Sequence, residues 1–247
     1  MARRRARAGH RTPRSAAAVA ADVEILRRVS YFRSLPAAAL RGLAQSCSSR
    51  TLAPGETLFQ EGAPATHLFV IAAGRVELRQ TSLRGREQVF HTEQPGAALG
   101  EAPLFDAGGY IASAVAVEAG RVLSLPRLRL IALCRTHPDV ALGIVETLAR
   151  RVRRFADLVG DLAFRPVPER LARYVLSAAG GRPLTPGLEL DLQLTQAQLA
   201  ARLGTVRELV ARALAQLDQA GVVSRRGARV VVRDPARLRA LAEGGGE

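Results

Sequence analysis

Three polar residues, Arg207, Glu208 and Arg212, stand close together in a segment with helical periodicity. Arginine can donate two parallel hydrogen bonds to O6 and N7 of guanine, and glutamate can accept one from N4 of cytosine. These residue types at this spacing can therefore read base pairs from one helix face. The alternative is a solvated helix face with an Arg–Glu pair at the end of a small bundle, and the helical pattern alone does not decide between the two.

Two short helices joined by a turn would position these side chains. Apolar residues recur at helical spacing, with Thr195 as a cap for the first helix and Gly204 in the turn. Thr205 with Glu208 three residues later predicts a capping box at the start of the second helix. This order predicts a helix-turn-helix over residues 195–215, in which the start of the second helix faces the major groove.

A hairpin with an arginine-rich tip follows these helices. Residues 221–223 and 230–232 have the pattern of two strands, with Arg225 and Arg226 at the turn between them. A wing of this kind can contact DNA phosphates. A helix-turn-helix followed by a wing favours DNA binding over a solvated helix face.

The basic charge of the chain supports a polyanionic partner. All 36 basic residues are arginine, and the net charge is +14. The excess lies in residues 1–14 and 165–247, so it coincides with the tail and the helix-turn-helix segment. The alternative is a solubilising surface in an arginine-rich protein.

Composition and motifs argue against several other classes. The two cysteines, Cys47 and Cys134, lack the spacing of a disulfide framework or metal site, and we expect a reducing, cytoplasmic setting. No apolar run approaches the ~20 residues of a membrane span. The sequence shows no nucleophile–base pair, metal-ligand cluster or phosphate-binding glycine loop, so we expect no enzyme activity.

The remaining pattern predicts an α+β chain in four parts. Residues 1–20 are expected to be a disordered basic tail, with a DNA-contacting arm as the alternative. Residues 21–136 begin with helices and continue as short strands with glycine turns, which predicts an antiparallel β-roll. Residues 137–164 form a long helix, and residues 165–240 form the winged helix-turn-helix domain after a proline-rich hinge.

The long helix carries an apolar stripe with the spacing of a coiled coil. The stripe can pack on the chain's own roll or on a second copy. We favour a homodimer, because a DNA reader with two such modules meets two half-sites. The stripe consists of Ile144, Leu148, Val152, Phe155, Val159 and Leu162.

The order of parts resembles the cyclic-AMP receptor and fumarate–nitrate regulator (Crp/Fnr) superfamily. The resemblance rests on the segments YFRSLPAAAL, LAPGETLFQEGAPATHLFVIAAGRVEL, GEAPLF, HPDVALGIVETLARRVRR and LTQAQLAARLGTVRELVARAL, and covers residues 25–235. It implies a homodimeric transcription regulator whose long central helix is the dimer seam and whose roll binds an effector. An activator of this type would also contact RNA polymerase.

The resemblance is close at the DNA-binding end. The family pattern Arg-Glu-x-x-x-Arg stands here as Arg207, Glu208 and Arg212, which implies a half-site like TGTGA. Arg202 in the first helix and Gln196 at its start would add backbone contacts.

The resemblance is poor at the effector end. Cyclic-AMP binders follow Gly-Glu with a downstream Arg-Ser or Arg-Thr that holds the phosphate, but Ile111 and Ala112 stand at those positions after Gly100-Glu101. A buried phosphate without a cation is costly. The adenine contacts on the long helix fall at Phe155-Ala156. We therefore expect that cyclic AMP is not bound in the standard pose.

Other effectors remain open. The segment around Tyr110 is similar to haem-linked members, but an axial ligand could come only from His10, His67, His91 or His137. A thiol switch and a regulator that needs no ligand are further alternatives, as is a ligand- or redox-sensing module whose winged helix contacts another protein. We predict no cofactor. The candidate residues of the effector pocket are Gly100, Glu101, Tyr110, Ser113 and Phe155.

Overall fold

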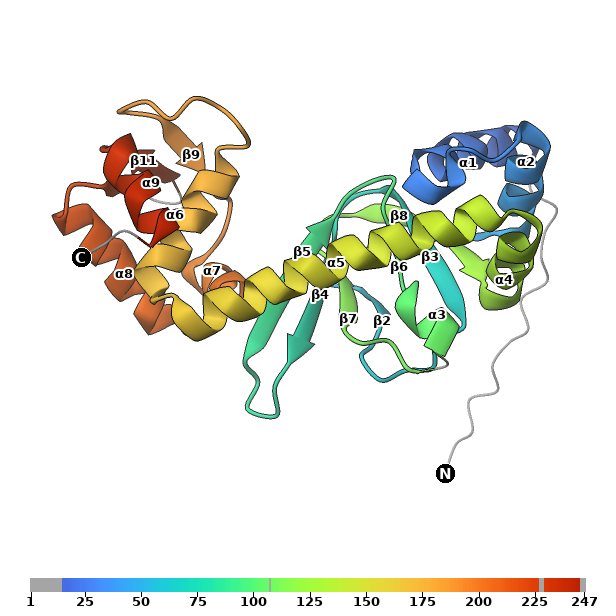
Figure 1. Cartoon of the computed structure of the whole chain (residues 1–247), viewed down its shortest axis with the longest axis horizontal. Helices are drawn as coiled ribbons and strands as arrows, with labels where there is room; N and C mark the ends of the chain where they lie inside the picture. The colour runs from blue at the N-terminus through green and yellow to red at the C-terminus, as the bar shows by residue number, and fades with distance from the viewer. Residues whose placement is uncertain (1–14, 107, 227–228, 245–247) are drawn as a thin grey trace.

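The computed structural model describes residues 15–106, 108–226 and 229–244. A β-roll and a helical C-terminal domain lie at opposite ends of the molecule, and one long helix runs across the roll toward the C-terminal domain (Figure 1). This mixed helix and sheet architecture confirms the predicted fold class. None of the helices in the described ranges has the length and hydrophobicity that a membrane crossing requires.

The N-terminal helices cover one end of the roll. They are α1 (Ala16–Arg28), the 3-10 helix η1 (Ser30–Phe32) and α2 (Ala37–Ser46). The prediction of a disordered tail over residues 1–20 is wrong from Ala16 onward, because Ser15 caps α1 through Ala18 N and its alanines favour a helix. Residues 1–14 lie outside the described part of the chain. Pro36 is the N-cap of α2.

Two four-stranded antiparallel sheets make the roll, with strand orders β1-β8-β3-β6 and β2-β7-β4-β5. Apolar side chains from both sheets form one core with the N-terminal helices. The short helix α3 (Ala102–Asp106) lies between β6 and β7. The strands are β1 (Ser48–Leu52), β2 (Thr57–Phe59), β3 (His67–Ala73), β4 (Val76–Thr81), β5 (Glu87–Glu93), β6 (Ala98–Leu99), β7 (Ser113–Ala116) and β8 (Gly120–Pro126).

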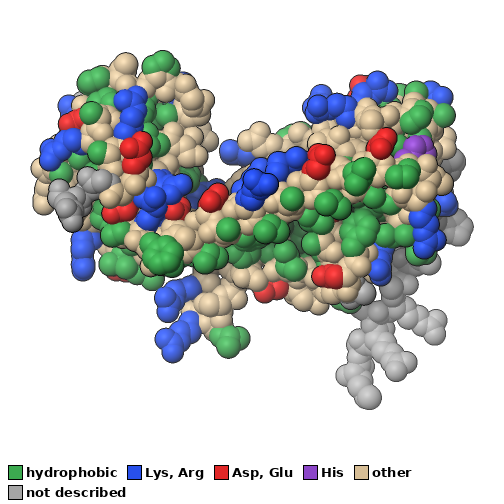
Figure 2. Space-filling model, viewed as in Figure 1, with side chains coloured by type: hydrophobic (Ala, Val, Ile, Leu, Met, Phe, Trp, Pro, Cys, Tyr) green, Lys and Arg blue, Asp and Glu red, His purple; other side chains and the backbone are tan. Residues whose placement is uncertain are grey.

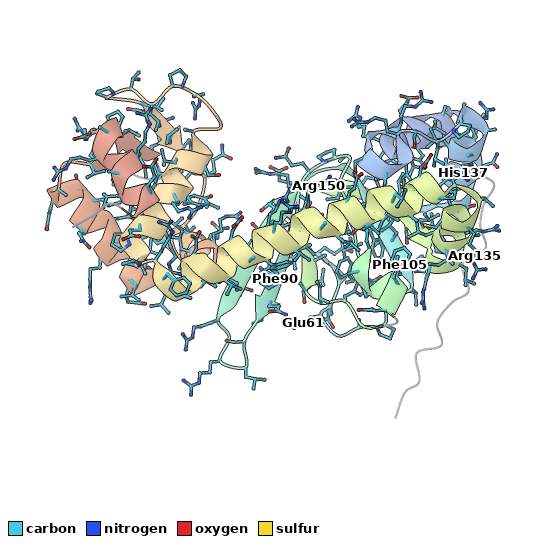
Figure 3. All side chains as sticks on the ribbon, viewed as in Figure 1. Glu61, Phe90, Phe105, Arg135, His137 and Arg150 are labelled. Carbon is cyan, nitrogen blue, oxygen red and sulfur yellow. The ribbon has the colours of Figure 1, made fainter. Side chains whose placement is uncertain are left out.

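The helix α4 (Arg127–Thr136) leads into the long helix α5 (Pro138–Phe164). Pro138 sits in the first turn of α5, where its missing N–H costs nothing, and Asp139 complements the helix dipole there. The first half of α5 packs against η1 and α4. Figure 3 shows Phe90 and Arg150 at opposite edges of α5.

The predicted dimer stripe on α5 is partly covered by the roll, while its members Val152, Val159 and Leu162 are exposed. Ile144 is only 2% exposed and Leu148 packs against the roll core, while Phe155 stacks edge-on against Phe90. The roll takes this face because it offers an apolar partner inside the same chain. A second apolar set, here called the outer stripe, points away from the roll. The outer stripe consists of Leu142, Val145, Ala149, Val152, Ala156 and Val159, all exposed.

The C-terminal domain has its own core, built from four helices and a small sheet. The three-stranded antiparallel sheet has the order β10-β11-β9. The elements are α6 (Val167–Ala178), β9 (Glu189–Asp191), α7 (Gln196–Leu203), α8 (Arg207–Gln219), β10 (Val223–Arg226), β11 (Arg229–Val232) and α9 (Pro235–Glu243). The strands β10 and β11 pair as a hairpin, as predicted, but Arg225 and Arg226 belong to β10 and not to the turn, because their backbones pair with Val230 and Arg229.

The turn between α7 and α8 differs from the predicted one in its capping. The capping box is at α7, where Thr195 and Gln198 exchange hydrogen bonds. The predicted box at α8 does not form, because the Thr205 N–H donates to Ala200 O and so completes the end of α7. Val206 becomes the N-cap of α8 and has no side-chain cap. Gly204 adopts the left-handed conformation that the tight turn requires.

Candidate effector pocket and nucleic-acid interface

The helix α8 exposes the three side chains with base-reading chemistry. Arg207, Glu208 and Arg212 are exposed, while Val210 and Ala213 on the opposite side are buried in the domain core. The predicted face is therefore free of the domain's own packing. A protruding row of two arginines and a glutamate at the start of a helix fits the edges of base pairs in a major groove.

The other predicted DNA contacts lie in different settings. Arg225 is exposed on β10, and Thr205 and Gln196 are half-buried at the two ends of α7. The backbone of Arg226 pairs with Arg229 in the wing, while its side chain lies outside the described part. Arg202 does not project to solvent. It reaches the roll, where its guanidinium pairs with Glu77 and donates to Thr92 Oγ1 at 3.1 Å.

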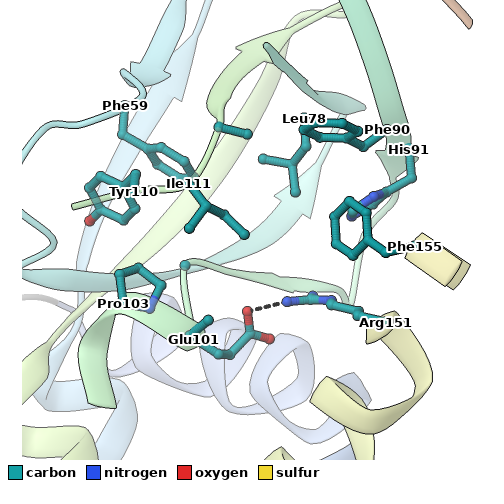
Figure 4. A pocket seen from close by; sticks show the side chains of 13 residues that line it. Phe59, Leu78, Phe90, His91, Glu101, Pro103, Tyr110, Ile111, Arg151 and Phe155 are labelled. Atoms are coloured by element: carbon teal, nitrogen blue, oxygen red, sulfur yellow. Dashed lines mark hydrogen bonds and ion pairs between the residues drawn. The ribbon is translucent and has the colours of Figure 1, made fainter. Parts of the chain in front are cut away.

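A mainly apolar pocket of about 50 Å³ opens between the roll and α5. Phe59 and Tyr110 stack with ring centroids 4.0 Å apart on one side, and Phe90 meets Phe155 on the other (Figure 4). Strands β2, β4 and β5, the α3 region and α5 all contribute side chains. The pocket is lined by Phe59, Leu78, Phe90, His91, Gly100, Glu101, Ala102, Pro103, Tyr110, Ile111, Ala112, Arg151 and Phe155.

The structure brings together four of the five residues predicted for this pocket. Gly100, Glu101, Tyr110 and Phe155 line it, but Ser113 does not. The Ser113 hydroxyl instead accepts a hydrogen bond from Glu61 N at 3.0 Å.

A buried ion pair forms the floor of the pocket. Glu101 is 1% exposed and accepts from Arg151 Nη1 at 2.6 Å and from Tyr31 Oη at 3.2 Å. Arg151 Nη2 donates to Ala98 O at 2.7 Å. Burial raises the pKa of Glu101 although Arg151 opposes the change, and burial raises the pKa of Tyr31 well above its ordinary value. Burial acts to lower the pKa of Arg151, but Glu101 outweighs it and the net shift is upward, so the guanidinium stays charged.

Sequence reasoning missed Arg151, and a signal for it existed. Arg151 stands one helical turn before Phe155, so a pocket that Phe155 lines from α5 also receives the side chain at 151. A buried Glu101 also requires a cation or donors nearby. The two facts together point to an arginine on that face of α5.

The two residues expected at the phosphate positions of a cyclic-AMP site, Ile111 and Ala112, are both apolar. Ile111 lies at the pocket mouth with 56% of its surface exposed, and Ala112 is buried. Gln80 donates to Ile111 O at 2.9 Å, which uses the backbone acceptor of that residue. Among the described residues that line the pocket, Arg151 is the one arginine, and Glu101 neutralises it.

No described residues form a group of three metal-ligating side chains. His67 and His137 contact the hydroxyls of Thr66 and Thr136 through Nδ1, and His91 lies 3.2 Å from Glu93. His10 lies outside the described residues.

The cysteines have the surroundings of unreactive thiols. Cys47 is buried and Cys134 half-buried. Burial raises the pKa of Cys134, which lowers its thiolate fraction and disfavours a redox role.

Comparisons with known proteins identify both halves of the chain. The sequence profile of the cyclic nucleotide-binding domain matches residues 49–137, and that of the Crp-like helix-turn-helix domain matches residues 169–241. The chain belongs to the Crp/Fnr family of transcription regulators. This membership confirms the resemblance inferred from the sequence and establishes the general role of a DNA-binding transcription regulator.

The similarity to relatives of this Crp/Fnr protein extends over nearly the full length of those relatives. The cyclic AMP receptor protein of Thermus thermophilus is 39% identical over 204 residues, 82% of this chain and 92% of the relative. The CRP-like cAMP-activated global transcriptional regulator of Mycobacterium tuberculosis is 31% identical over 217 residues, 87% of this chain and 97% of the relative. The solved catabolite activator protein of Thermus thermophilus is 32% identical, covers 88% of this chain and 100% of its own, and gives a TM-score of 0.50.

Proposed function

We propose that the chain is a homodimeric, sequence-specific regulator whose α8 reads TGTGA-like half-sites. The observation that carries the proposal is the exposed row Arg207, Glu208 and Arg212 at the start of α8. The two arginines would each meet a guanine, and the glutamate a cytosine.

The dimer part of the proposal rests on the outer stripe. Its apolar side chains follow a 3-4-3-4-3 spacing along α5, the a/d repeat of a two-stranded coiled coil. Val145, Val152 and Val159 are each at least 60% exposed. Figure 2 shows hydrophobic side chains gathered on the face of the molecule that carries α5. A second copy packed along this seam would cover them and place two α8 helices on one duplex.

We further propose that cyclic AMP does not control this regulator in the standard pose, although the names of two relatives include that nucleotide. Ile111 and Ala112 offer neither a cation nor a hydroxyl to a cyclic phosphate. Phe90 and Phe155 fill part of the space, and the remaining 50 Å³ is small for a purine nucleotide.

The experiment is a fluorescence-anisotropy titration on a duplex with inverted TGTGA and TCACA half-sites and on a scrambled duplex, at ~150 mM salt. We expect selective binding that cyclic AMP does not change. Arg212→Ala should lose about 1–3 kcal/mol on the matched duplex and relax the preference at one guanine. Arg239→Ala, an exposed arginine on α9, serves as the matched control and should retain selectivity.

Two results would contradict the proposal. Equal losses by Arg212→Ala on the matched and scrambled duplexes would show that Arg212 contributes only charge. Selective binding that appears only with cyclic AMP would show that the pocket accepts the nucleotide without an arginine at position 111. A sensor whose winged helix binds another protein would be favoured if no duplex, including those from an unbiased selection, is preferred.

A further inference from the structure

The helix-turn-helix contacts the roll through residues that a DNA duplex would also need. The helix α7 lies against β5, at the junction of the two domains (Figure 1). Arg202 of α7 pairs with Glu77 of β4 and donates to Thr92 of β5. At the turn, Gly204 lies so close to Leu162 and Gln88 that a Cβ on it would collide with both.

The acceptors on the roll are built into its sheet. Glu77 and Thr92 face each other across the β4–β5 pair, so the two strands present a carboxylate and a hydroxyl side by side. Glu77 is only 9% exposed, and the side chain of Arg202 is 18% exposed. The guanidinium is therefore largely withdrawn from solvent in this arrangement.

The contact of Arg202 with the roll leaves one donor of the guanidinium unsatisfied, which favours release of Arg202 from the roll. Arg202 Nε is buried without a hydrogen-bond partner among the described residues. A buried ion pair recovers its desolvation cost only when the remaining donors are also satisfied. A phosphate, like a carboxylate, can accept two parallel hydrogen bonds from a guanidinium in a bidentate pair. DNA phosphate can thus replace Glu77 at little cost in geometry.

We propose that the roll edge formed by Glu77 and Thr92 is an internal competitor for the DNA-binding face of α7. Arg202 exchanges the Glu77 carboxylate for a DNA phosphate when the duplex binds. The proposal rests on the proposed function only in taking DNA as the ligand of this domain. The apparent Kd for DNA then equals the intrinsic Kd divided by the fraction of molecules with Arg202 released.

The same strand connects this contact to the pocket. Phe90 and His91 of β5 line the pocket, and their neighbour Thr92 holds Arg202. A change in the position of β5 at the pocket therefore acts directly on the strand that competes with DNA.

The test is the variant Glu77→Gln, which keeps the size of the side chain and removes its charge. We expect binding about three- to tenfold tighter on both matched and scrambled duplexes, as for a release from roughly 10–30% to full population of the competent state. Glu56→Gln is the matched control: it removes one negative charge from a roll residue that pairs with Arg50, away from α7. It should leave the affinity within experimental error of the wild type.

A double-mutant cycle separates the Arg202 contact from any general effect of charge. In an Arg202→Ala background, Glu77→Gln should give no further gain, because the competition it relieves is already absent. An unchanged affinity for Glu77→Gln, an equal gain for Glu56→Gln, or the same gain in the Arg202→Ala background would each overturn the proposal.

The two proposals fail in different ways. Loss of selectivity between the duplexes contradicts TGTGA recognition but leaves the effect of Glu77→Gln on both duplexes measurable. A Glu77→Gln protein that is folded by circular dichroism and binds neither duplex would overturn the competition itself.

Discussion

Truncation of two adjacent residues of α5 should affect two different properties: Val145 the stability of the dimer, and Ile144 the stability of the fold. Val145 is 60% exposed on the outer stripe, and Ile144 is 2% exposed in the roll core. Val145→Ala removes two carbon groups worth about 0.8 kcal/mol each when fully buried. Scaled by the exposed fraction that a partner would cover, the loss is about 1 kcal/mol per protomer and about 2 kcal/mol per dimer. The dimer dissociation constant should rise about thirtyfold.

Ile144→Val should instead lower the free energy of unfolding by about 0.5–1.5 kcal/mol and leave the dimer constant unchanged. Sedimentation equilibrium measures dimerisation, and urea unfolding at a fixed protomer concentration measures stability. Leu128→Ala on α4, 81% exposed and outside the stripe, is the control for loss of exposed apolar surface. If Ile144→Val weakens the dimer and Val145→Ala does not, the seam lies on the other face of α5 and the outer stripe is not the interface.

Three further changes test the packing of the roll. Glu101→Gln removes the nearest counter-ion of the buried Arg151, which keeps only the Glu93 carboxylate at 3.9 Å. It should cost about 3 kcal/mol in urea unfolding, the lower end for a broken buried pair, because glutamine keeps an acceptor. The double variant Glu101→Gln/Arg151→Met should recover part of this cost, and an unchanged stability of the single variant would contradict the argument. Gly143→Ala should lower the free energy of unfolding by about 1–3 kcal/mol, because its Cβ would lie 2.6 Å from Tyr31 in the 3-10 helix. Gly160→Ala on the same helix meets nothing within 4 Å and should raise the free energy of unfolding by up to about 1 kcal/mol. Equal effects of the two variants would refute the packing argument. Burial lowers the pKa of His67, so the stability that neutral His67 contributes is present above its unfolded pKa of about 6.5 and is lost as the pH falls through the lower folded value. His67→Gln should therefore flatten the acid side of the profile of unfolding free energy against pH, measured in urea. An unchanged acid slope would contradict this.

The sequence predicted most elements because their ends carry local chemical signals. Pro138 marks the start of α5 and the Arg165-Pro166 step marks its end, and both bounds agree with the structure. The alternation of short strands and glycine turns predicted the roll. The predicted disorder over residues 1–20 is wrong from Ala16 onward, because a lack of large apolar residues does not prevent an alanine-rich, capped helix.

Periodicity alone does not decide which apolar face of α5 would form a dimer seam. The helix carries two apolar stripes, one through Ile144 and Leu148 and one through Val145 and Ala149. Both stripes are compatible with a heptad repeat, and Val152 belongs to both. The choice depends on which face the roll covers, and that is a property of the tertiary packing.

The arginines Arg151 and Arg202 show the same limit in chemical terms. An arginine in a half-buried position requires an anion or several acceptors, and its residue type establishes that much. The sequence suggested a DNA phosphate for Arg202, and the structure supplies the Glu77 carboxylate. It suggested no partner for Arg151, and the structure supplies Glu101 from the other side of the pocket. Both carboxylates come from residues more than 40 positions away in the chain, so no local pattern links them to their arginines. The type of ligand for a guanidinium is thus readable from sequence, whereas the choice among competing anions is made by the fold. In a regulator that exchanges one anion for another, this choice is the point at which control can act.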